Sequence, residues 1–337
     1  METGPIRPPS EAASLYVRVS RNCPWNRCRF CPVYKGQRFS RRPLEHVLRD
    51  IDVVAHAQSL AVRRRTVFLQ DANALGVPYE DLLQILLHLK KRLPWVERIT
   101  SYARSQSILR LSAEQLAELK AAGLGRIHVG FESGSDEVLA FMQKGATKEM
   151  HVEAGLRVKQ AGIELSAYYM PGLGGRRLLR ENAIETADLM RQVVPDYLRL
   201  RTLAIPDRVP LAEDVAEGRF EKAGDMETAQ EILLFLEHVG DIPCELMSDH
   251  TVNLFQDLNG NLATNRETMV SEVRRFLALE PESQRTYMVG RRLGVFMGLG
   301  DMEVPHLRAH AEAECRRLGV TAENAAALTD ELVKRFV

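Results

Sequence analysis

The sequence is poor in cysteine, in net charge and in long apolar runs. It has five cysteines in 337 residues, and its 45 basic residues balance 45 acidic ones. A balanced charge provides no overall field that would attract nucleic acid or an anionic membrane. No apolar run approaches the roughly 20 residues that span a bilayer, and the N-terminus lacks the apolar core of a secretory signal. We therefore expect a cytoplasmic globular protein without a membrane or nucleic-acid partner.

Three of the five cysteines nevertheless stand close together. Cys23, Cys28 and Cys31 lie in the stretch NCPWNRCRFCPVYKGQRF, residues 22–39, with the spacing C-x4-C-x2-C. Thiolates are the usual ligands of iron–sulfur clusters, and a complete cluster site has four of them. Three leave one iron open to a substrate or cofactor, as in catalytic metal sites. We expect such a centre to be oxygen-sensitive, which agrees with a reducing compartment.

The spacing alone is also compatible with three plainer roles for these cysteines. A zinc site would need a fourth ligand such as His46 or His56, and neither stands at a usual finger spacing. A disulfide would leave one cysteine over and is disfavoured in a reducing compartment. Three inert, buried cysteines at this density would be a coincidence.

The charged residues around the cysteines are all basic. Residues 21–42 contain seven basic residues and no acidic one. Such a group is either a solvated loop or a means of offsetting the negative charge of a cluster and receiving an anionic group.

The stretch resembles the cluster loop of the radical S-adenosylmethionine (SAM) enzymes, including Phe30 just before the last cysteine. The resemblance implies that the three cysteines hold a [4Fe-4S] cluster and that SAM chelates the fourth iron. It implies an electron donor such as ferredoxin or flavodoxin, reductive cleavage of SAM, and hydrogen abstraction from a substrate by a 5′-deoxyadenosyl radical. The first gap is one residue longer than the commonest C-x3-C-x2-C spacing, which leaves the subfamily open.

Strand-like and helix-like stretches alternate over the first two thirds of the chain. The six expected strands lie near residues 15–20, 66–75, 98–104, 126–132, 163–169 and 195–205. Strands alternating with helices predict a parallel sheet of right-handed crossovers. Six strands fall short of the eight of a closed barrel, and an open (βα)6 barrel is the arrangement of the family that the loop resembles. The expected fold class is therefore α/β, a partial (βα)6 barrel with a helical C-terminal extension.

We expect three segments: a flexible leader at residues 1–13, the partial barrel at 14–220, and a mainly helical extension at 221–337 that covers the barrel mouth. The extension begins beyond the last expected strand and includes an irregular polar connection at residues 248–261. It also contains Arg291 and Arg292, which would either meet an anionic substrate or cap a helix C-terminus.

The stretch GFESGSDEVLAFMQKGAT, residues 130–147, resembles the fourth strand and following helix of the HemN- and MiaB-like branches. The resemblance places Glu132 near the methionyl or ribose part of SAM. Strand alternation puts Glu132 and His128 on one face of the strand. The alternatives are a capping carboxylate for Glu132 and a satisfied interior histidine for His128.

Two further strand ends resemble SAM-binding positions. The stretch DANAL, residues 71–75, stands where the family often has a Gly-Gly-Glu turn, and Asp71 or Asn73 would offer oxygen acceptors to the SAM ammonium group. Arg104, at the end of the third strand, resembles residues that bind the SAM carboxylate, a task suited to a guanidinium. The alternative for residues 71–75 is an ordinary turn, and the alternative for Arg104 is a surface arginine.

The remaining expected cofactor contacts follow the fifth and sixth strands. The turn MPGLGG, residues 170–175, resembles the glycine-rich turn near the adenine, which needs close approach of the backbone at Gly172 and Gly174. Arg201 is a candidate for a contact with SAM or substrate by the same resemblance.

The remaining cysteines, Cys244 and Cys315, are far apart and cannot hold a second cluster. This argues against a methylthiotransferase-type reaction. We expect a radical SAM enzyme that acts on a small molecule. The alternatives are an RNA-modifying radical SAM enzyme, which would use clustered Lys and Arg on phosphates, and a metal-binding redox or regulatory protein without SAM chemistry.

Overall fold

The computed structural model describes residues 6–59 and 63–335. They form two compact units. Unit 1 contains the chain up to Phe131 and residues 145–167, and unit 2 contains residues 132–144 and the chain from Tyr168 onward. The predicted domain boundaries at residues 13 and 220 stay predictions.

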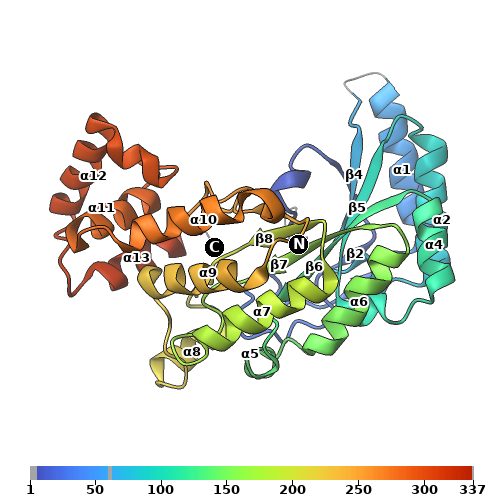
Figure 1. Cartoon of the computed structure of the whole chain (residues 1–337). Coiled ribbons are helices and arrows are strands. Elements are labelled where there is room, and N and C mark those ends of the chain that lie inside the picture. Colours follow the sequence, from blue (N-terminus) through green and yellow to red (C-terminus); the bar gives the residue numbers. More distant parts are fainter. Residues whose placement is uncertain (1–5, 60–62, 336–337) are drawn as a thin grey trace. The chain divides into compact units, whose positions relative to one another are not determined.

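Unit 1 alternates strands and helices (Figure 1). Its helices α1, α2, α4 and α6 lie in a row, each beside the next. Its elements are η1 (Pro9–Glu11), β1 (Leu15–Arg18), β2 (Ser20–Arg21), β3 (Ser40–Arg41), α1 (Leu44–Ser59), β4 (Thr66–Gln70), η2 (Ala74–Gly76), α2 (Tyr79–Arg92), β5 (Arg98–Ala103), α3 (Ser105–Ile108), α4 (Ala113–Ala121), β6 (Leu124–Glu132), α6 (Lys148–Gln160) and β7 (Glu164–Tyr169). The last residue of β6 and the last two residues of β7 belong to unit 2.

The main sheet has the strand order β1-β4-β5-β6-β7-β8-β9-β10. The strand pairs β1–β4, β4–β5 and β5–β6 are parallel. Val67, Phe68 and Leu69 of β4 are fully buried, as expected for a strand covered on both faces. In the described part of the chain β1 and β10 are the two ends of this order, so the sheet is not closed. The six predicted strands are all present.

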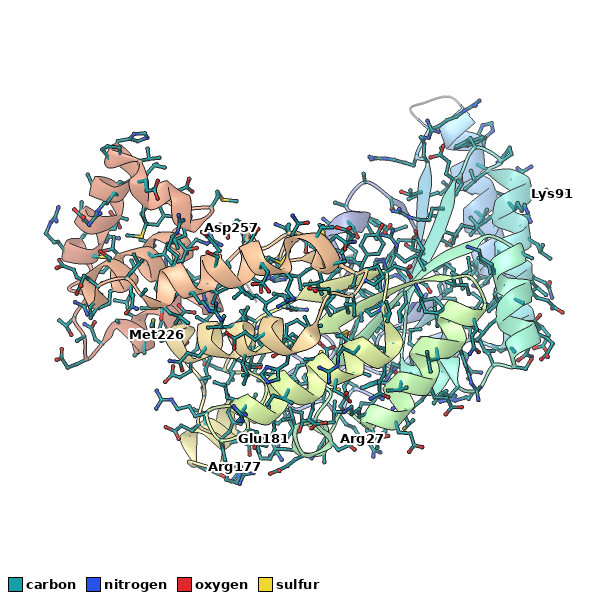
Figure 2. All side chains as sticks on the ribbon, in the orientation of Figure 1. Arg27, Lys91, Arg177, Glu181, Met226 and Asp257 are labelled. Carbon is teal, nitrogen blue, oxygen red and sulfur yellow. The ribbon has the colours of Figure 1, made fainter. Side chains whose placement is uncertain are left out.

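Local sequence signals account for several helix ends. Ser112 begins α4 with a capping box: its hydroxyl accepts from the backbone N–H of Gln115, whose side chain accepts from the N–H of Ser112. Helix α2 has two acids in its first turn and three bases in its last turn, which complements the helix dipole. Lys91 in that last turn points outward (Figure 2).

Unit 2 is mainly helical after β8. Its helices α7, α9 and α10 lie side by side, and α11 contacts both α12 and α13 (Figure 1). Its elements are α5 (Asp136–Phe141), α7 (Leu179–Val193), β8 (Tyr197–Leu200), α8 (Pro210–Ala216), α9 (Asp225–Val239), β9 (Glu245–Met247), β10 (Gly260–Asn261), α10 (Leu262–Leu277), α11 (Pro281–Arg292), η3 (Leu299–Glu303), α12 (Pro305–Arg317) and α13 (Ala325–Lys334).

The C-terminal third differs from expectation by two strands. Strand β9 pairs in parallel with β8, and the short β10 pairs antiparallel with β9. Between them lies the predicted polar connection, which Asn253 organises by accepting from the Thr202 backbone N–H at 2.9 Å and donating to the Leu200 carbonyl at 2.9 Å. Three-residue and two-residue strands carry too little alternation to be recognised in a sequence.

The N-terminal segment expected as a flexible leader includes a buried charge. Residues 1–5 lie outside the described part. Glu11, at the end of η1, is fully buried and accepts from the Ser14 hydroxyl at 2.6 Å. Its Oε1 lies 3.5 Å from Nε2 of the fully buried His128. His128 is thus an interior histidine with a carboxylate partner, in agreement with the structural role considered for it above.

No helix in the described part of the chain combines the length and apolar character needed to cross a membrane.

Candidate functional site

The cysteine loop, residues 22–39, is closed at its base by a two-residue hairpin. Strands β2 and β3 pair antiparallel, with Ser20 opposite Arg41 and Arg21 opposite Ser40. The base is tied to the main sheet because the Val19 N–H donates to the Gln70 carbonyl at 2.7 Å. The loop therefore leaves the sheet beside the end of β4 and returns to the same place.

Two asparagines shape the interior of the loop. Asn22 and Asn26 have positive φ angles of 64° and 47°, a conformation that asparagine tolerates better than most residues. The Asn26 amide donates to the Tyr34 carbonyl at 2.6 Å, and the Lys35 ammonium donates to the Asn26 carbonyl at 3.1 Å. These bonds tie the middle of the loop to its later part.

The three loop cysteines are reduced thiols, each partly exposed. The negative charges of the cysteines affect the pKa values of two neighbouring side chains, Tyr34 and Arg104. Burial raises the pKa of Tyr34, and the negative charges of Asp71, Cys23 and Cys31 raise it further. Burial lowers the pKa of Arg104, and Cys23 and Cys28 oppose that shift. Tyr34 thus lies within electrostatic reach of Cys23 and Cys31, and Arg104 within reach of Cys23 and Cys28.

This donor set fits an iron–sulfur cluster. Within residues 6–59 and 63–335, no three Cys, His, Asp or Glu side chains gather around one metal-ion position. In a cubane cluster each thiolate binds a different iron, so the three sulfur atoms need to surround a volume rather than meet at a point. Three free, partly exposed thiols on one loop provide three of the four ligands that a cluster site uses. His46, the nearer candidate for a zinc ligand, lies beside Glu45 with a half-exposed ring.

Trp25 and Phe30 provide the apolar part of the loop. Phe30 is 7% exposed. The Trp25 ring has the Arg104 guanidinium 4.9 Å from its centroid and the Arg27 guanidinium 5.1 Å away, Arg27 being labelled in Figure 2. A Cβ atom added to Gly145 would lie 2.3 Å from Trp25, so the indole rests directly on that backbone. Cation–π contacts of this kind contribute about 0.5–1 kcal/mol each at exposed sites.

Asp71, which we predicted to meet the SAM ammonium group, is fully buried. Its carboxylate accepts hydrogen bonds from other residues of the chain. Its Oδ2 accepts from Arg18 Nη1 at 2.9 Å and from the Asn22 N–H at 3.1 Å, and its Oδ1 accepts from the Tyr34 hydroxyl at 2.5 Å. A carboxylate has about four acceptor sites, and three of them are used here. The structure therefore connects Asp71 to the cysteine loop.

Asn73 positions Arg104. Its Oδ1 accepts from the Arg104 backbone N–H at 3.1 Å, and its amide donates to the Ser107 hydroxyl at 2.8 Å. Both atoms of the buried amide are thus used inside unit 1. The structure brings Asn73 and Arg104 together, and it places Arg104 within electrostatic reach of Cys23 and Cys28. The backbone of Arg104 is held while its guanidinium faces the Trp25 ring.

In unit 2, the predicted glycine-rich turn is held by a residue that the sequence did not point out. The N–H of Gly172, where φ is +86°, donates to Glu231 Oε2 at 2.9 Å. Glu231 Oε1 accepts from the Tyr169 hydroxyl at 2.7 Å and the Asn182 amide at 2.6 Å. Burial raises the pKa of Glu231 to about 7 against these hydrogen bonds. A Cβ atom on Gly174 would lie 2.5 Å from the Leu178 carbonyl, so that glycine permits packing within the turn.

Glu132, also in unit 2, is paired with Lys144, the Nζ and Oε1 atoms lying 3.0 Å apart and both side chains being 13% exposed. Its φ angle is +68°. Strand alternation therefore does not decide where this side chain points, because the backbone leaves the β conformation at this residue. The capping alternative is wrong, since Ser135 caps α5 by accepting from the Val138 N–H.

Arg201 follows β8, and its N–H donates to the Tyr169 carbonyl at 3.0 Å. His250 lies near it: burial and the charge of Arg201 lower the pKa of His250 to about 4, and Asp249 opposes them. Arg201 thus has a neutral histidine beside it.

Arg291 and Arg292 are structural. Arg291 donates to the carbonyls of Leu254 and Asn253, and Arg292 donates to the Val252 carbonyl and to Asp225. Both are nearly fully buried. Cys244 is also fully buried, which agrees with a core role.

Four residues that organise these segments were not predicted from the sequence: Arg18, Trp25, Tyr34 and Glu231. Arg18 precedes the cysteine loop, and Trp25 and Tyr34 lie in it. The sequence does show an aromatic residue shortly after Cys23 and another shortly after Cys31, and this pattern could have pointed to Trp25 and Tyr34. Glu231 lies in the middle of an amphipathic helix, and only its contacts distinguish it from a surface glutamate.

The radical SAM superfamily model matches residues 17–190, just over half of the chain. A tRNA-2-methylthio-N(6)-dimethylallyladenosine synthase from Alkalilimnicola ehrlichii is 32% identical over 184 residues, which are 50% of this chain and 38% of the relative. A synthase of the same name from Geotalea uraniireducens is 25% identical over 293 residues, 80% of this chain and 63% of the relative. The chain thus spans between about two fifths and just under two thirds of these relatives.

Among solved structures, the cobalamin-dependent S-adenosylmethionine radical enzyme OxsB, with aqua-cobalamin and S-adenosylmethionine bound, superposes with a TM-score of 0.53 at 16% identity. The match covers 95% of this chain and 58% of OxsB. It confirms the predicted fold class. Enzymes of the matched family use a [4Fe-4S] cluster and SAM. With the family model covering both the cysteine loop and five of the parallel strands, this chain belongs to the radical SAM superfamily and is a radical SAM enzyme.

Proposed function

We propose that Cys23, Cys28 and Cys31 hold a [4Fe-4S] cluster at which SAM is reductively cleaved. The observation that carries this proposal is the set of three reduced thiols on one loop, all within electrostatic reach of Tyr34 or Arg104. These three residues would hold the cluster, which when bound would supply the electron for reductive cleavage of SAM.

The contribution of unit 1 is to hold and neutralise this loop. Arg104 places a positive charge beside Cys23 and Cys28, which opposes the repulsion among the thiolates. Its guanidinium is also the group we propose for the SAM carboxylate, because a planar fork of N–H donors matches a carboxylate. Asn73 keeps the Arg104 backbone in place, and Phe30 excludes water from the loop.

The contribution of unit 2 is proposed from the family resemblance and from local backbone geometry. Gly172 and Gly174 are the proposed backbone contacts of the SAM adenine, and the φ of +86° at Gly172 gives the tight turn that such a contact needs. Glu132 and Arg201 are the proposed polar contacts of SAM or substrate in this unit.

We propose a small-molecule substrate. The chain has no net charge, so the general attraction that drives binding to a polyanion is missing. Outside the loop the sequence has only Cys244 and Cys315, too few for the auxiliary cluster of a methylthiotransferase-type reaction.

RNA is the second candidate substrate, because the two relatives above are named as enzymes that modify tRNA. The seven basic residues at positions 21–42 would then include phosphate contacts. A salt dependence of binding distinguishes this candidate, because each phosphate contact adds to the slope of log K against log salt concentration.

The test is anaerobic reconstitution with iron and sulfide, followed by dithionite and SAM, with and without a tRNA pool. We expect 5′-deoxyadenosine from the wild type by mass spectrometry, about four irons per chain, and neither from Cys28→Ala. Cys244→Ala is the matched control and should behave as the wild type, because Cys244 lies in a different unit.

The outcomes separate the candidates. A wild type that binds one zinc and no iron would refute the cluster, and iron binding without any 5′-deoxyadenosine would refute SAM cleavage. Stimulation of 5′-deoxyadenosine formation by tRNA, lost at high salt, would favour RNA over a small molecule.

A further inference from the structure

The carboxylate of Asp71 touches the cysteine loop near both of its ends. Asp71 directly follows the last residue of β4 and lies outside the cysteine loop. Oδ2 accepts from the N–H of Asn22, the residue before Cys23, and Oδ1 accepts from the hydroxyl of Tyr34, three residues after Cys31. All three cysteines therefore lie between two contacts with one fixed side chain.

A third contact anchors the carboxylate. Arg18, at the end of β1, donates to Oδ2 at 2.9 Å, with side-chain exposures of 13% for Arg18 and 1% for Asp71. Because β1 and β4 are paired in parallel with Arg18 opposite Gln70, the ion pair is built on two adjacent strands. Charge-assisted hydrogen bonds of this kind are stronger than neutral ones, and side chains on strands hold a site more rigidly than loops do.

Tyr34 carries the constraint into the middle of the loop. Its side chain is 3% exposed, and its carbonyl accepts from the Asn26 amide at 2.6 Å. Asn26 lies between Cys23 and Cys28. The chain Asp71–Tyr34–Asn26 thus reaches the neighbourhood of every cysteine from a single point just after β4.

From this geometry we propose that Asp71 is a positioning residue that holds the cysteine loop in its ligating conformation before any metal binds. The inference rests on the proposed cluster on these cysteines, and it assigns Asp71 to the loop instead of the SAM ammonium group. Fixing a flexible loop in advance removes an entropic cost that metal binding would otherwise have to overcome.

The test uses hydrogen exchange of the metal-free full-length protein. Asp71→Asn keeps the size but replaces one acceptor oxygen by an N–H donor, which then faces another donor. We expect exchange over residues 22–34 to become about tenfold faster, the effect of losing roughly 1.4 kcal/mol of local hydrogen bonding. We also expect fewer irons per chain after anaerobic reconstitution. Asp52→Asn, the same change at a half-exposed pair with His88 and Arg92, is the control and should leave both unchanged.

Tyr34→Phe is the second variant, for the case in which Asp71→Asn loosens all of unit 1. It removes one end of the constraint only, so exchange should accelerate after Cys31 while the Asn22 N–H stays protected. Unchanged exchange in this variant, or faster exchange in Asp71→Asn with wild-type iron uptake, would overturn the proposal. Absence of 5′-deoxyadenosine from an iron-loaded wild type would count against the proposed function alone, because the exchange measurement needs neither metal nor SAM.

Discussion

Two segments of this protein, one in each unit, are held in the same way but with different charge. The cysteine loop of unit 1 gives the N–H of Asn22 and the hydroxyl of Tyr34 to the buried carboxylate of Asp71. In unit 2 the buried carboxylate of Glu231 accepts from the N–H of Gly172 in the glycine-rich turn and from the hydroxyl of Tyr169, the residue just before that turn. The third donor is the charged Arg18 for Asp71 and the neutral Asn182 amide for Glu231.

The difference shows how the charge of the hydrogen-bond donors affects the pKa of a buried carboxylate. All three hydrogen-bond donors of Glu231 are neutral, and its burial raises the pKa to about 7. A buried carboxylate beside a guanidinium is compensated by an opposite charge, whereas one held by neutral donors is stabilised less in its ionised form. We therefore expect the stability of the glycine-rich turn to depend on pH.

The largest effect should come from removing the unit 2 anchor. Glu231→Leu leaves the Gly172 N–H, the Tyr169 hydroxyl and the Asn182 amide without their acceptor in a buried site. Each unsatisfied buried group costs about 1–3 kcal/mol, so we expect a loss of about 3 kcal/mol or more in the free energy of unfolding, measured by urea titration. Glu237→Leu on the same helix, where Glu237 meets Arg274 in an exposed pair, should cost less than about 1 kcal/mol. Equal losses would show that Glu231 is not an anchor.

The next effect tests whether the cysteine loop depends on a second support besides Asp71. Gly145→Ala introduces a methyl group 2.3 Å from Trp25 at a φ of +68°, whereas Gly162→Ala has a φ of +71° and open space around it. Both should lose about 1–2 kcal/mol from backbone strain, and Gly145→Ala should lose about 1–3 kcal/mol more from the clash. Thermal unfolding of the two variants measures the difference. Similar losses of stability in the two variants would mean that the Trp25 ring moves aside without destabilising the protein.

The pH dependence of Glu231 provides the third test. A carboxyl group whose pKa rises from 4.5 to about 7 on folding binds its proton more tightly in the folded protein. Its stabilising contribution is complete below pH 4.5 and is lost as the pH rises through about 7. In Glu231→Gln this contribution is absent. The unfolding free energy of the wild type relative to Glu231→Gln should therefore fall by about 1 kcal/mol per pH unit between about pH 5 and 7. A constant difference would contradict the raised pKa.

The smallest effect is expected for Tyr169→Phe. The Tyr169 hydroxyl favours the ionised form of Glu231, so its removal should raise the pKa of Glu231 further and cost about 1 kcal/mol of stability. The pH titration of the previous experiment should then shift to higher pH. A shift to lower pH would mean that the hydroxyl does not donate to the carboxylate.

Much of the fold was predictable because its signals are local. The alternation of apolar strands with helices correctly placed β1, β4, β5, β6, β7 and β8. The polar residues at 248–261 gave no sign of β10, whose two residues pair with β9 well before it in the chain. Pairing between separate short segments depends on the tertiary structure and has no periodic signature.

The candidate site was predictable to the same extent. The spacing of Cys23, Cys28 and Cys31 is written in one short stretch of residues and identified the loop and the family. The role that we propose for Asp71 was not predictable, because a carboxylate after a strand is compatible with ligand binding or with an internal anchor. Its hydrogen bonds to Arg18, Asn22 and Tyr34 are the basis for proposing the anchor.

The sequence by itself determined the chemistry of this protein: three thiols at one spacing, six strand-like stretches and the helix boundaries between them. These follow from residue types and short-range periodicity, which the chain carries before it folds. Only the tertiary structure decided which carboxylates hold the functional segments. A buried acid is defined by the donors around it, and those of Asp71 and Glu231 come from positions 37 to 62 residues away, brought together by the packing of strands and helices.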